Sequence, residues 1–184
     1  MMITARVLTP ALLLLLITQP LLAQQEPPEI IFSHSTRDLV FQVPPEFQLV
    51  TQDRRYLNPR AHETPRFQRI WRHGSDSIIV NVVVLPEPIW QQKTPTGIFA
   101  KSLANMLSDP TLKLMSRRNY ELDGCSAESI TCYYDSANST SQRMDCFLSK
   151  PYMFMIAYVS SKPSSWDDPA SKAFFQTISL KPKK

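Results

Sequence analysis

Two of the three cysteines are placed where they could form a disulfide. Cys132 and Cys146 lie at equal distances from Ser139, in two strand-like runs that flank a turn-like segment. If the runs pair about that centre, Cys132 faces Cys146 and Ile130 faces Leu148, on one apolar face. Directly opposed residues have Cα separations of about 4.5 to 5.5 Å, within disulfide range. The pattern predicts a Cys132–Cys146 disulfide in an oxidising compartment; the alternative is two buried thiols.

The third cysteine, Cys125, has no partner in this pairing. It follows the Asp123-Gly124 turn at the start of a strand-like run. An odd thiol in an exported protein could pair with another chain or react. The alternative is a thiol that is partly buried where the strand begins.

No other residues in the sequence have the spacing of a known catalytic or metal motif. His34, His62 and His73 are scattered, and no cysteine pair has zinc spacing. Neither G-x-S-x-G nor H-E-x-x-H occurs. We therefore predict no catalytic residue, no metal and no cofactor, with a site assembled across the fold as the alternative.

The candidate binding surface is a basic segment with interleaved aromatic residues. Between Gln52 and His73, six arginines stand against Asp53 and Glu63, a local charge of +4. Arginine with aromatic residues is typical of interface hot spots, and could equally hold an anionic headgroup or polysaccharide. The alternative is a solvated loop and strand edge. The predicted binding residues are Arg54, Arg55, Tyr56, Arg60, Arg66, Arg69 and Trp71.

The elements that must position these residues follow from hydrophobic periodicity. Alternating or wholly apolar runs predict strands over 38–43, 47–50, 66–73 and 77–85, with a long loop over 52–66. Helical spacing follows Thr94-Pro95, four more strand-like runs extend from 112 to 160, and a second helix follows Asp168-Pro169. Consecutive strands joined by short turns predict an α+β fold, in which two helices cover an antiparallel β-sheet.

The N-terminus reads as an export signal. Arg6 precedes an apolar run over 11–17, and the small residue Ala23 precedes two glutamines. The run is shorter than the roughly 20 residues of a membrane span, so we expect a signal peptide over 1–23, cut after Ala23. The alternative is an uncleaved anchor, because Leu21 is bulkier than the small residue preferred at that place before the cut. A leader over 24–30, one domain over 31–180 and a basic tail over 181–184 would follow. Removing Arg6 leaves a net charge of +3, too mild to demand a nucleic-acid partner.

Short motifs along the predicted domain resemble the PsbP-like superfamily. They are F-x-V-P-x-x-F from Phe41 to Phe47, an I-x-V-x-V strand, and F-F-x-T-I-S-L from Phe174 to Leu180. The superfamily includes the extrinsic photosystem protein of plants and many exported bacterial proteins. The resemblance implies an α/β/α sandwich and an accessory or binding role, but the matching positions are fold-forming residues and carry no functional residue over. The secretory leader differs from a transit peptide, so no photosynthetic role is implied.

Three functions remain open at this point. The leading hypothesis is a non-catalytic accessory or protein-binding domain of the cell envelope, periplasmic or secreted, with no transmembrane span in the mature chain. The first alternative is a small-ligand or lipid carrier with a pocket between sheet and helix. The second is a hydrolase whose site is assembled across the fold.

Overall fold

Ten strands and three helices make up the part of the chain that the structure describes. The computed structural model describes residues 29–33, 37–51, 66–135, 139–162 and 167–183. The strands are β1 (Glu29–Ser33), β2 (Arg37–Gln42), β3 (Gln48–Thr51), β4 (Arg66–His73), β5 (Asp76–Val84), β6 (Leu112–Leu122), β7 (Cys125–Tyr134), β8 (Thr140–Ser149), β9 (Tyr152–Ser160) and β10 (Ser179–Pro182). The helices are α1 (Glu87–Gln92), α2 (Pro95–Met106) and α3 (Pro169–Gln176).

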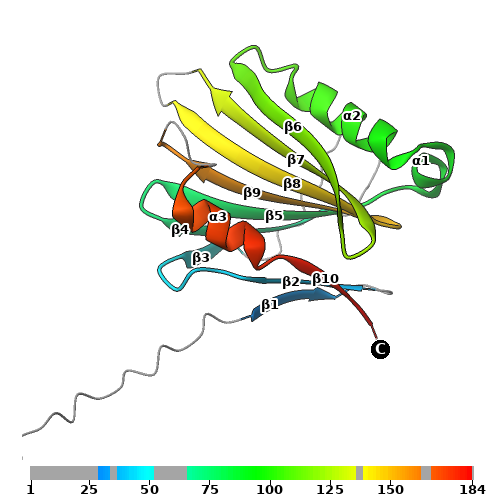
Figure 1. Ribbon diagram of the computed structural model, residues 1–184, viewed down its shortest axis with the longest axis horizontal. Coiled ribbons are helices and arrows are strands. Elements are labelled where there is room, and N and C mark those ends of the chain that lie inside the picture. Colours follow the sequence, from blue (N-terminus) through cyan, green and yellow to red (C-terminus); the bar gives the residue numbers. More distant parts are fainter. Residues whose placement is uncertain (1–28, 34–36, 52–65, 136–138, 163–166, 184) are drawn as a thin grey trace, which may run out of the picture.

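The strands form two sheets (Figure 1). The main sheet has seven strands in the order β3-β4-β5-β9-β8-β7-β6, and β1, β2 and β10 form a small sheet in the order β1-β2-β10. Every neighbouring pair is antiparallel. The predicted α+β class is therefore confirmed. The short helix α1, which follows Pro86, was not predicted from the sequence.

Two neighbouring inner strands of the main sheet, β5 and β9, are apolar on both faces. Ile78 and Val80 of β5 join one buried cluster, whereas Val83 joins another. In β9, Phe154 and Ile156 belong to the first cluster and Met153 to the second. Such runs are typical of strands covered on both sides, as the sequence predicts for them.

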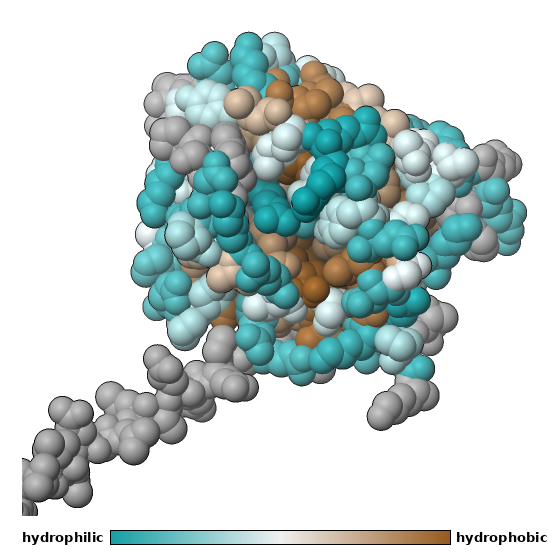
Figure 2. Space-filling view, in the orientation of Figure 1, coloured by the Kyte–Doolittle hydropathy of each residue, from teal (hydrophilic) through white to brown (hydrophobic). Residues whose placement is uncertain are grey.

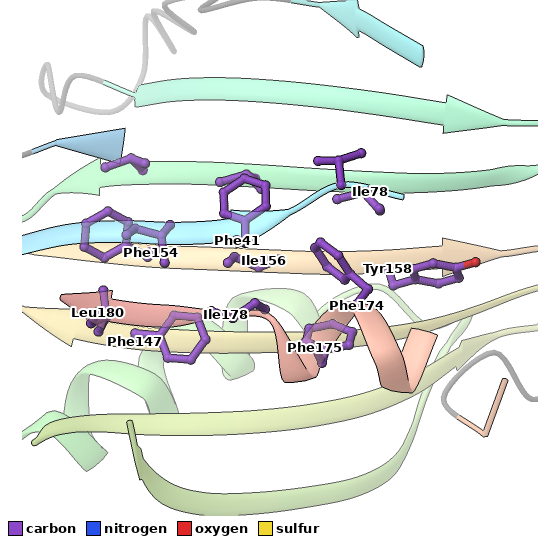
Figure 3. Close-up of a cluster of buried hydrophobic side chains, with 14 of the residues drawn as sticks. Phe41, Ile78, Phe147, Phe154, Ile156, Tyr158, Phe174, Phe175, Ile178 and Leu180 are labelled. Atoms are coloured by element: carbon purple, nitrogen blue, oxygen red, sulfur yellow. The ribbon is translucent and has the colours of Figure 1, made fainter. Parts of the chain in front are cut away.

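One face of the main sheet is covered by α3 and the small sheet. Phe174 and Phe175 of α3 point into a core that Phe41 of β2 and Leu180 of β10 also enter (Figure 3). The rings of Phe41 and Phe174 meet edge to face with centroids 6.1 Å apart, an arrangement that aromatic pairs favour. This core holds β2, α3 and β10 against the sheet although they are far apart in the sequence.

The opposite face is covered by α2. Ile98, Phe99 and Leu103 share one side of this helix and pack on Ile130 and Met144, among others, of the main sheet. Burying such a stripe stabilises the helix more than its intrinsic propensity does.

Both longer helices start as the sequence predicts. The Thr94 side chain accepts a hydrogen bond from the Gly97 amide at 3.2 Å, and the Asp168 carboxylate accepts one from the Ala170 amide at 3.0 Å. In each case a proline occupies the first helical turn, where its missing N–H costs nothing.

The register of β7 and β8 differs from the prediction. Cys132 faces Gln142, and Cys146 faces Glu128. The partner position of Cys132 is thus four residues from Cys146, or about 14 Å along the strand. The pairing centre lies two residues before Ser139, so the predicted Cys132–Cys146 register is wrong, and with it the geometric basis for the disulfide. Cys125, Cys132 and Cys146 are all free and buried.

The chain near the predicted leader contributes to the small sheet. β1 begins at Glu29, within the 24–30 stretch, and Ile30 faces Phe41 of β2. On its other side β2 pairs with β10, where Leu180 faces Leu39. The C-terminal strand thus closes the fold against the N-terminal hairpin.

Candidate functional site

A cavity of about 360 Å³ opens at the end of the main sheet where α2 begins. Three of its lining residues are cationic, Arg37 from the start of β2, Lys93 from the junction of α1 and α2, and Lys150 from the β8–β9 turn. No acidic residue is among the described residues that line it. The described lining residues are Arg37, Lys93, Pro95, Ile98, Gly124, Cys125, Ser126, Leu148, Ser149 and Lys150.

Arg37 is fixed in place by backbone carbonyls. Its Nη1 donates to the Asp123 carbonyl at 2.7 Å and to the Leu180 carbonyl at 3.1 Å. The nearby Asp123 carboxylate accepts the Leu180 amide at 2.6 Å. Asp123 and Gly124 both have positive φ, 50° and 73°, which forms the tight β6–β7 turn beside the cavity. The guanidinium is thus positioned by neutral acceptors at the junction of the two sheets.

The basic segment predicted as a binding surface divides between described and undescribed residues. Arg54, Arg55, Tyr56 and Arg60 lie outside the described residues. Arg66 begins β4 opposite Val83 of β5.

Of the other two residues predicted in this surface, Arg69 is half-buried and Trp71 packs inside the fold. The Arg69 guanidinium lies over the Phe32 ring at 4.5 Å from its centroid. Trp71 is 5% exposed, and its ring meets Phe41 edge to face at 5.8 Å. The prediction that Trp71 is a binding residue is wrong, because this position of β4 faces the core beneath β2.

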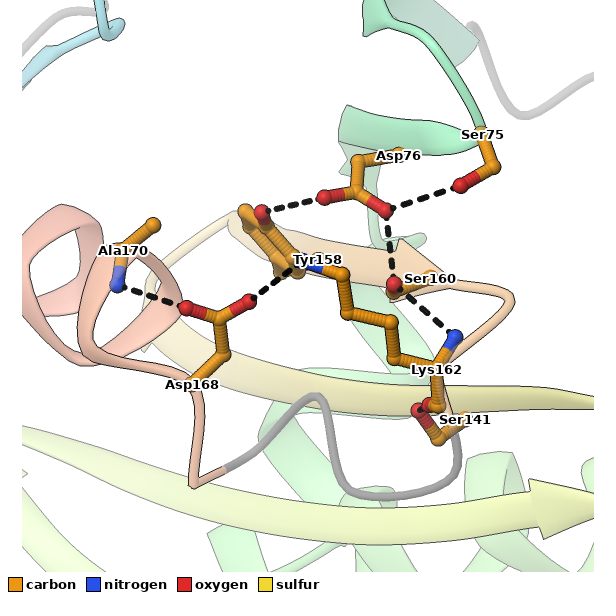
Figure 4. A network of polar contacts seen from close by, with 8 residues as sticks. All are labelled: Ser75, Asp76, Ser141, Tyr158, Ser160, Lys162, Asp168 and Ala170. Atoms are coloured by element: carbon orange, nitrogen blue, oxygen red, sulfur yellow. Dashed lines mark hydrogen bonds and ion pairs between the residues drawn. The ribbon is translucent and has the colours of Figure 1, made fainter.

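Three buried acids were not singled out by the sequence, and the first is Asp76 at the start of β5 (Figure 4). Its carboxylate accepts hydrogen bonds from Ser160 at 2.6 Å, Tyr158 at 3.0 Å and Ser75 at 3.3 Å. Burial, and then the hydrogen bond to Asp76, raises the pKa of Tyr158 well above its usual range. The Tyr158 phenol therefore stays protonated and ties β9 to β5.

The second acid, Asp145 in β8, is 2% exposed. It accepts hydrogen bonds from Ser129 at 2.6 Å, Tyr120 at 2.8 Å and Arg143 at 3.0 Å. Arg143 in turn lies over the Phe175 ring of α3, 4.0 Å from its centroid. Burial, followed by the Asp145 charge, raises the pKa of Tyr120 well above its ordinary value. This cluster joins β6, β7, β8 and α3.

The third acid, Glu128 in β7, is 1% exposed and pairs with Arg117 of β6 at 2.5 Å. Its Oε2 has no hydrogen-bond partner among the described residues. Glu128 faces Cys146, and burial followed by this charge raises the pKa of the Cys146 thiol far above its usual range. Burial alone raises the pKa of Cys132 to about 11. Neither thiol is primed as a nucleophile, because the thiolate is the reactive form.

In the described parts of the chain, no group of three or more His, Cys, Asp or Glu residues could hold a metal ion. No helix there has both the length and the apolar character needed to cross a membrane. Hydrophilic side chains cover most of the face that carries α3, and apolar ones are visible in a hollow near its centre (Figure 2).

The arrangement of α2, the main sheet, and α3 with the small sheet defines a PsbP-like fold. No family model matches the sequence, and no curated protein matches it. The structure resembles the cyanobacterial PsbP protein CyanoP from Synechocystis, with a TM-score of 0.55 and 11% identity over 77% of this chain and 86% of that one.

A second similar structure is LpqN of Mycobacterium tuberculosis, described as involved in cell envelope biogenesis. It gives a TM-score of 0.51 and 12% identity over 84% of this chain and 91% of that one. The PsbP-like resemblance predicted from the sequence is thus confirmed for the fold.

Proposed function

We propose that the protein is an exported, non-catalytic accessory domain that binds another protein of the cell envelope. The observation that carries this proposal is that the buried acidic side chains and the cationic side chains of the cavity are placed differently. The buried acids Asp76, Asp145 and Glu128 are engaged by neighbours within the fold, whereas cationic side chains line the cavity. The envelope role described for LpqN, which has a similar fold, is compatible with this proposal.

The buried acids are poor candidates for a hydrolase. A general acid or base must reach the substrate and exchange its proton at working pH. Asp145 and Glu128 are at most 2% exposed, and each carries an ion pair. Their contacts join neighbouring strands, which is a structural task.

The same structure argues against a lipid carrier. A carrier needs a deep apolar pocket, most simply between the sheet and a covering helix. On one face that space is filled by Ile98, Phe99 and Leu103 of α2, and on the other by Phe174 and Phe175 of α3. The cavity at Arg37 instead has three cationic residues in its wall.

The proposed binding surface is the basic segment 52–65, with Arg54, Arg55, Tyr56 and Arg60 as its contact residues. It connects β3 and β4, which are neighbours at one edge of the main sheet. Both ends of the segment are therefore anchored to the fold, which limits the conformational entropy lost when its contact residues bind a partner. Arginine and tyrosine are the residue types that most often dominate such contacts.

Cross-linking in intact cells tests the partner. The exported protein is compared with an Arg54→Glu/Arg55→Glu/Arg60→Glu variant and with a control that reverses three exposed lysines elsewhere, Lys101, Lys113 and Lys172. We expect the wild type and the control to cross-link to the same envelope protein and the arginine variant to lose it, with all three melting at similar temperatures. An unchanged cross-linked partner in the arginine variant would overturn the proposed surface.

Export itself is tested by the mass of the mature chain. We propose that the signal peptide over 1–23 is removed and that the mature protein starts at Gln24. Intact mass spectrometry of the protein from the periplasm or medium should give a chain that begins there. A full-length chain confined to the cytoplasm would contradict export.

A further inference from the structure

The cavity at Arg37 joins cationic side chains from three separate parts of the chain. Arg37, Lys93 and Lys150 are distant in the sequence, yet they line one space of about 360 Å³. Cationic side chains around an open cavity, with no acid among its described lining residues, create a positive potential that attracts an anion. We propose that this cavity binds a phosphate group carried by a small organic molecule or by a lipid.

The start of α2 adds to the positive potential. Pro95 and Ile98 of its first turn belong to the cavity wall, and α2 is 12 residues long. The N-terminal end of a helix carries a partial positive charge that favours anions. Thr94 already accepts the Gly97 amide, so the helix contributes its dipole rather than a free row of amides.

Arg37 is suited to hold the anion because its position is already set. The Asp123 and Leu180 carbonyls fix one guanidinium nitrogen, Nη1. Among the described residues, no carboxylate accepts a hydrogen bond from the Arg37 guanidinium. The Asp123 carboxylate is itself engaged by the Leu180 amide. A planar guanidinium that is held in one orientation loses little entropy when it binds two oxygens of a phosphate.

The rest of the wall favours a phosphate ester. The lining includes Ser126 and Ser149, which carry hydroxyl groups, and the apolar residues Ile98 and Leu148. Hydroxyl groups can donate to phosphate oxygens, and an apolar wall can contact the carbon atoms of an esterified group. The cavity is far larger than a single water, about 30 Å³, and is large enough to admit both the phosphate and the group esterified to it.

The direct test is an NMR titration of the full mature protein with inorganic phosphate, at constant ionic strength maintained with chloride. We expect the amide signals of Gly124, Ser126 and Lys150 to shift in a saturable way. A Lys93→Gln/Lys150→Gln variant removes two exposed cations of the cavity and should bind phosphate about tenfold more weakly. Each exposed charge contributes roughly fivefold or less to the affinity. A Lys101→Gln/Lys113→Gln control removes the same charge elsewhere and should bind as the wild type does.

The source of the phosphate is tested separately. Glycerol phosphate that binds more tightly than inorganic phosphate, without sedimentation of the protein on phosphatidylglycerol vesicles, would identify a small soluble ester. Sedimentation on those vesicles that the Lys93→Gln/Lys150→Gln variant loses would identify a lipid headgroup. Both outcomes support a phosphate site.

Two results would overturn the proposal. The first is no saturable shift at Gly124, Ser126 or Lys150 up to about 20 mM phosphate, far above a millimolar dissociation constant. The second is equal binding by the wild type and the Lys93→Gln/Lys150→Gln variant. The proposal does not rest on the basic segment 52–65, so loss of a protein partner in the arginine variant leaves it unaffected.

Discussion

The Tyr158 phenol donates a hydrogen bond of 3.0 Å to the Asp76 carboxylate, across the β5–β9 pair at the middle of the main sheet. Tyr158 is 1% exposed, and its ring also packs edge to face on Phe47 with centroids 6.0 Å apart. One side chain thus fills the aromatic core and satisfies a buried acid, which makes this pair a local determinant of stability.

Removing the Tyr158 hydroxyl should destabilise the fold with little change in packing. Tyr158→Phe leaves Asp76 with the Ser160 and Ser75 hydroxyls, so we expect a loss of about 1 to 2 kcal/mol in the free energy of unfolding. Urea denaturation measures it. Tyr133→Phe, at a half-buried position of β7, serves as the control and should change stability by under about 0.5 kcal/mol. Equal stability of the two variants would refute a structural role for the Tyr158–Asp76 bond.

The ion pair between Arg143 and Asp145 should contribute strongly because the acid is buried. Arg143→Met leaves Asp145, 2% exposed, with only the Tyr120 and Ser129 hydroxyls, and we expect a cost of about 3 kcal/mol. Adding Asp145→Asn to Arg143→Met should recover part of the loss, because the uncompensated charge is removed.

Unfolding curves of the single and double variants measure the coupling of Arg143 and Asp145. The control is Lys172→Met, which breaks the exposed ion pair with Asp167 and should cost under about 0.5 kcal/mol. If Arg143→Met lowers the free energy of unfolding no more than Lys172→Met does, the buried ion pair contributes no more to stability than the exposed one.

The three thiols should remain reduced and differ in reactivity. Intact mass under non-reducing conditions should match the chain with free Cys125, Cys132 and Cys146, since the register separates the last two. In the native state a thiol reagent at pH 8 should label Cys125 first, because it lies in the cavity wall, whereas burial raises the pKa of Cys132 and of Cys146. Peptide mapping locates the label. A mass lower by two protons, or labelling of Cys146 before Cys125, would contradict this arrangement.

Local patterns predict the elements of this fold better than its long-range pairings. The strand over 66–73 and the helix starts at Thr94 and Asp168 are found where the sequence places them. The pairing of β2 with β10 joins residues from opposite ends of the chain, and no local period encodes it.

The register predicted for Cys132 and Cys146 is wrong for a reason that periodicity cannot detect. Moving β8 by four residues against β7 is an even shift, so every side chain keeps its face of the sheet while every partner changes. The same apolar pattern therefore fits both registers, and the turn decides between them.

The candidate site could not be predicted from the sequence either. Arg37, Lys93 and Lys150 belong to no motif, and only the fold brings them to one cavity. Trp71 shows the converse case. Its place in an arginine-rich stretch predicted a surface residue, yet its strand parity directs it into the core.

Alkaline pH should destabilise the fold through Cys132. Its pKa rises from an ordinary value of 9.0 to about 11 in the folded protein, so above about pH 9 the unfolded chain loses this proton first and is favoured. The stability that Cys132 contributes is complete below pH 9 and is lost as the pH rises to 11, a change of about 2 kcal/mol.

Urea midpoints between pH 8 and 11 should fall less steeply for Cys132→Ala than for the wild type. The control Ile130→Val, on the same face of β7, should lower stability equally at every pH. Parallel pH profiles for Cys132→Ala and the wild type would exclude titration of Cys132 as the cause of the alkaline loss of stability.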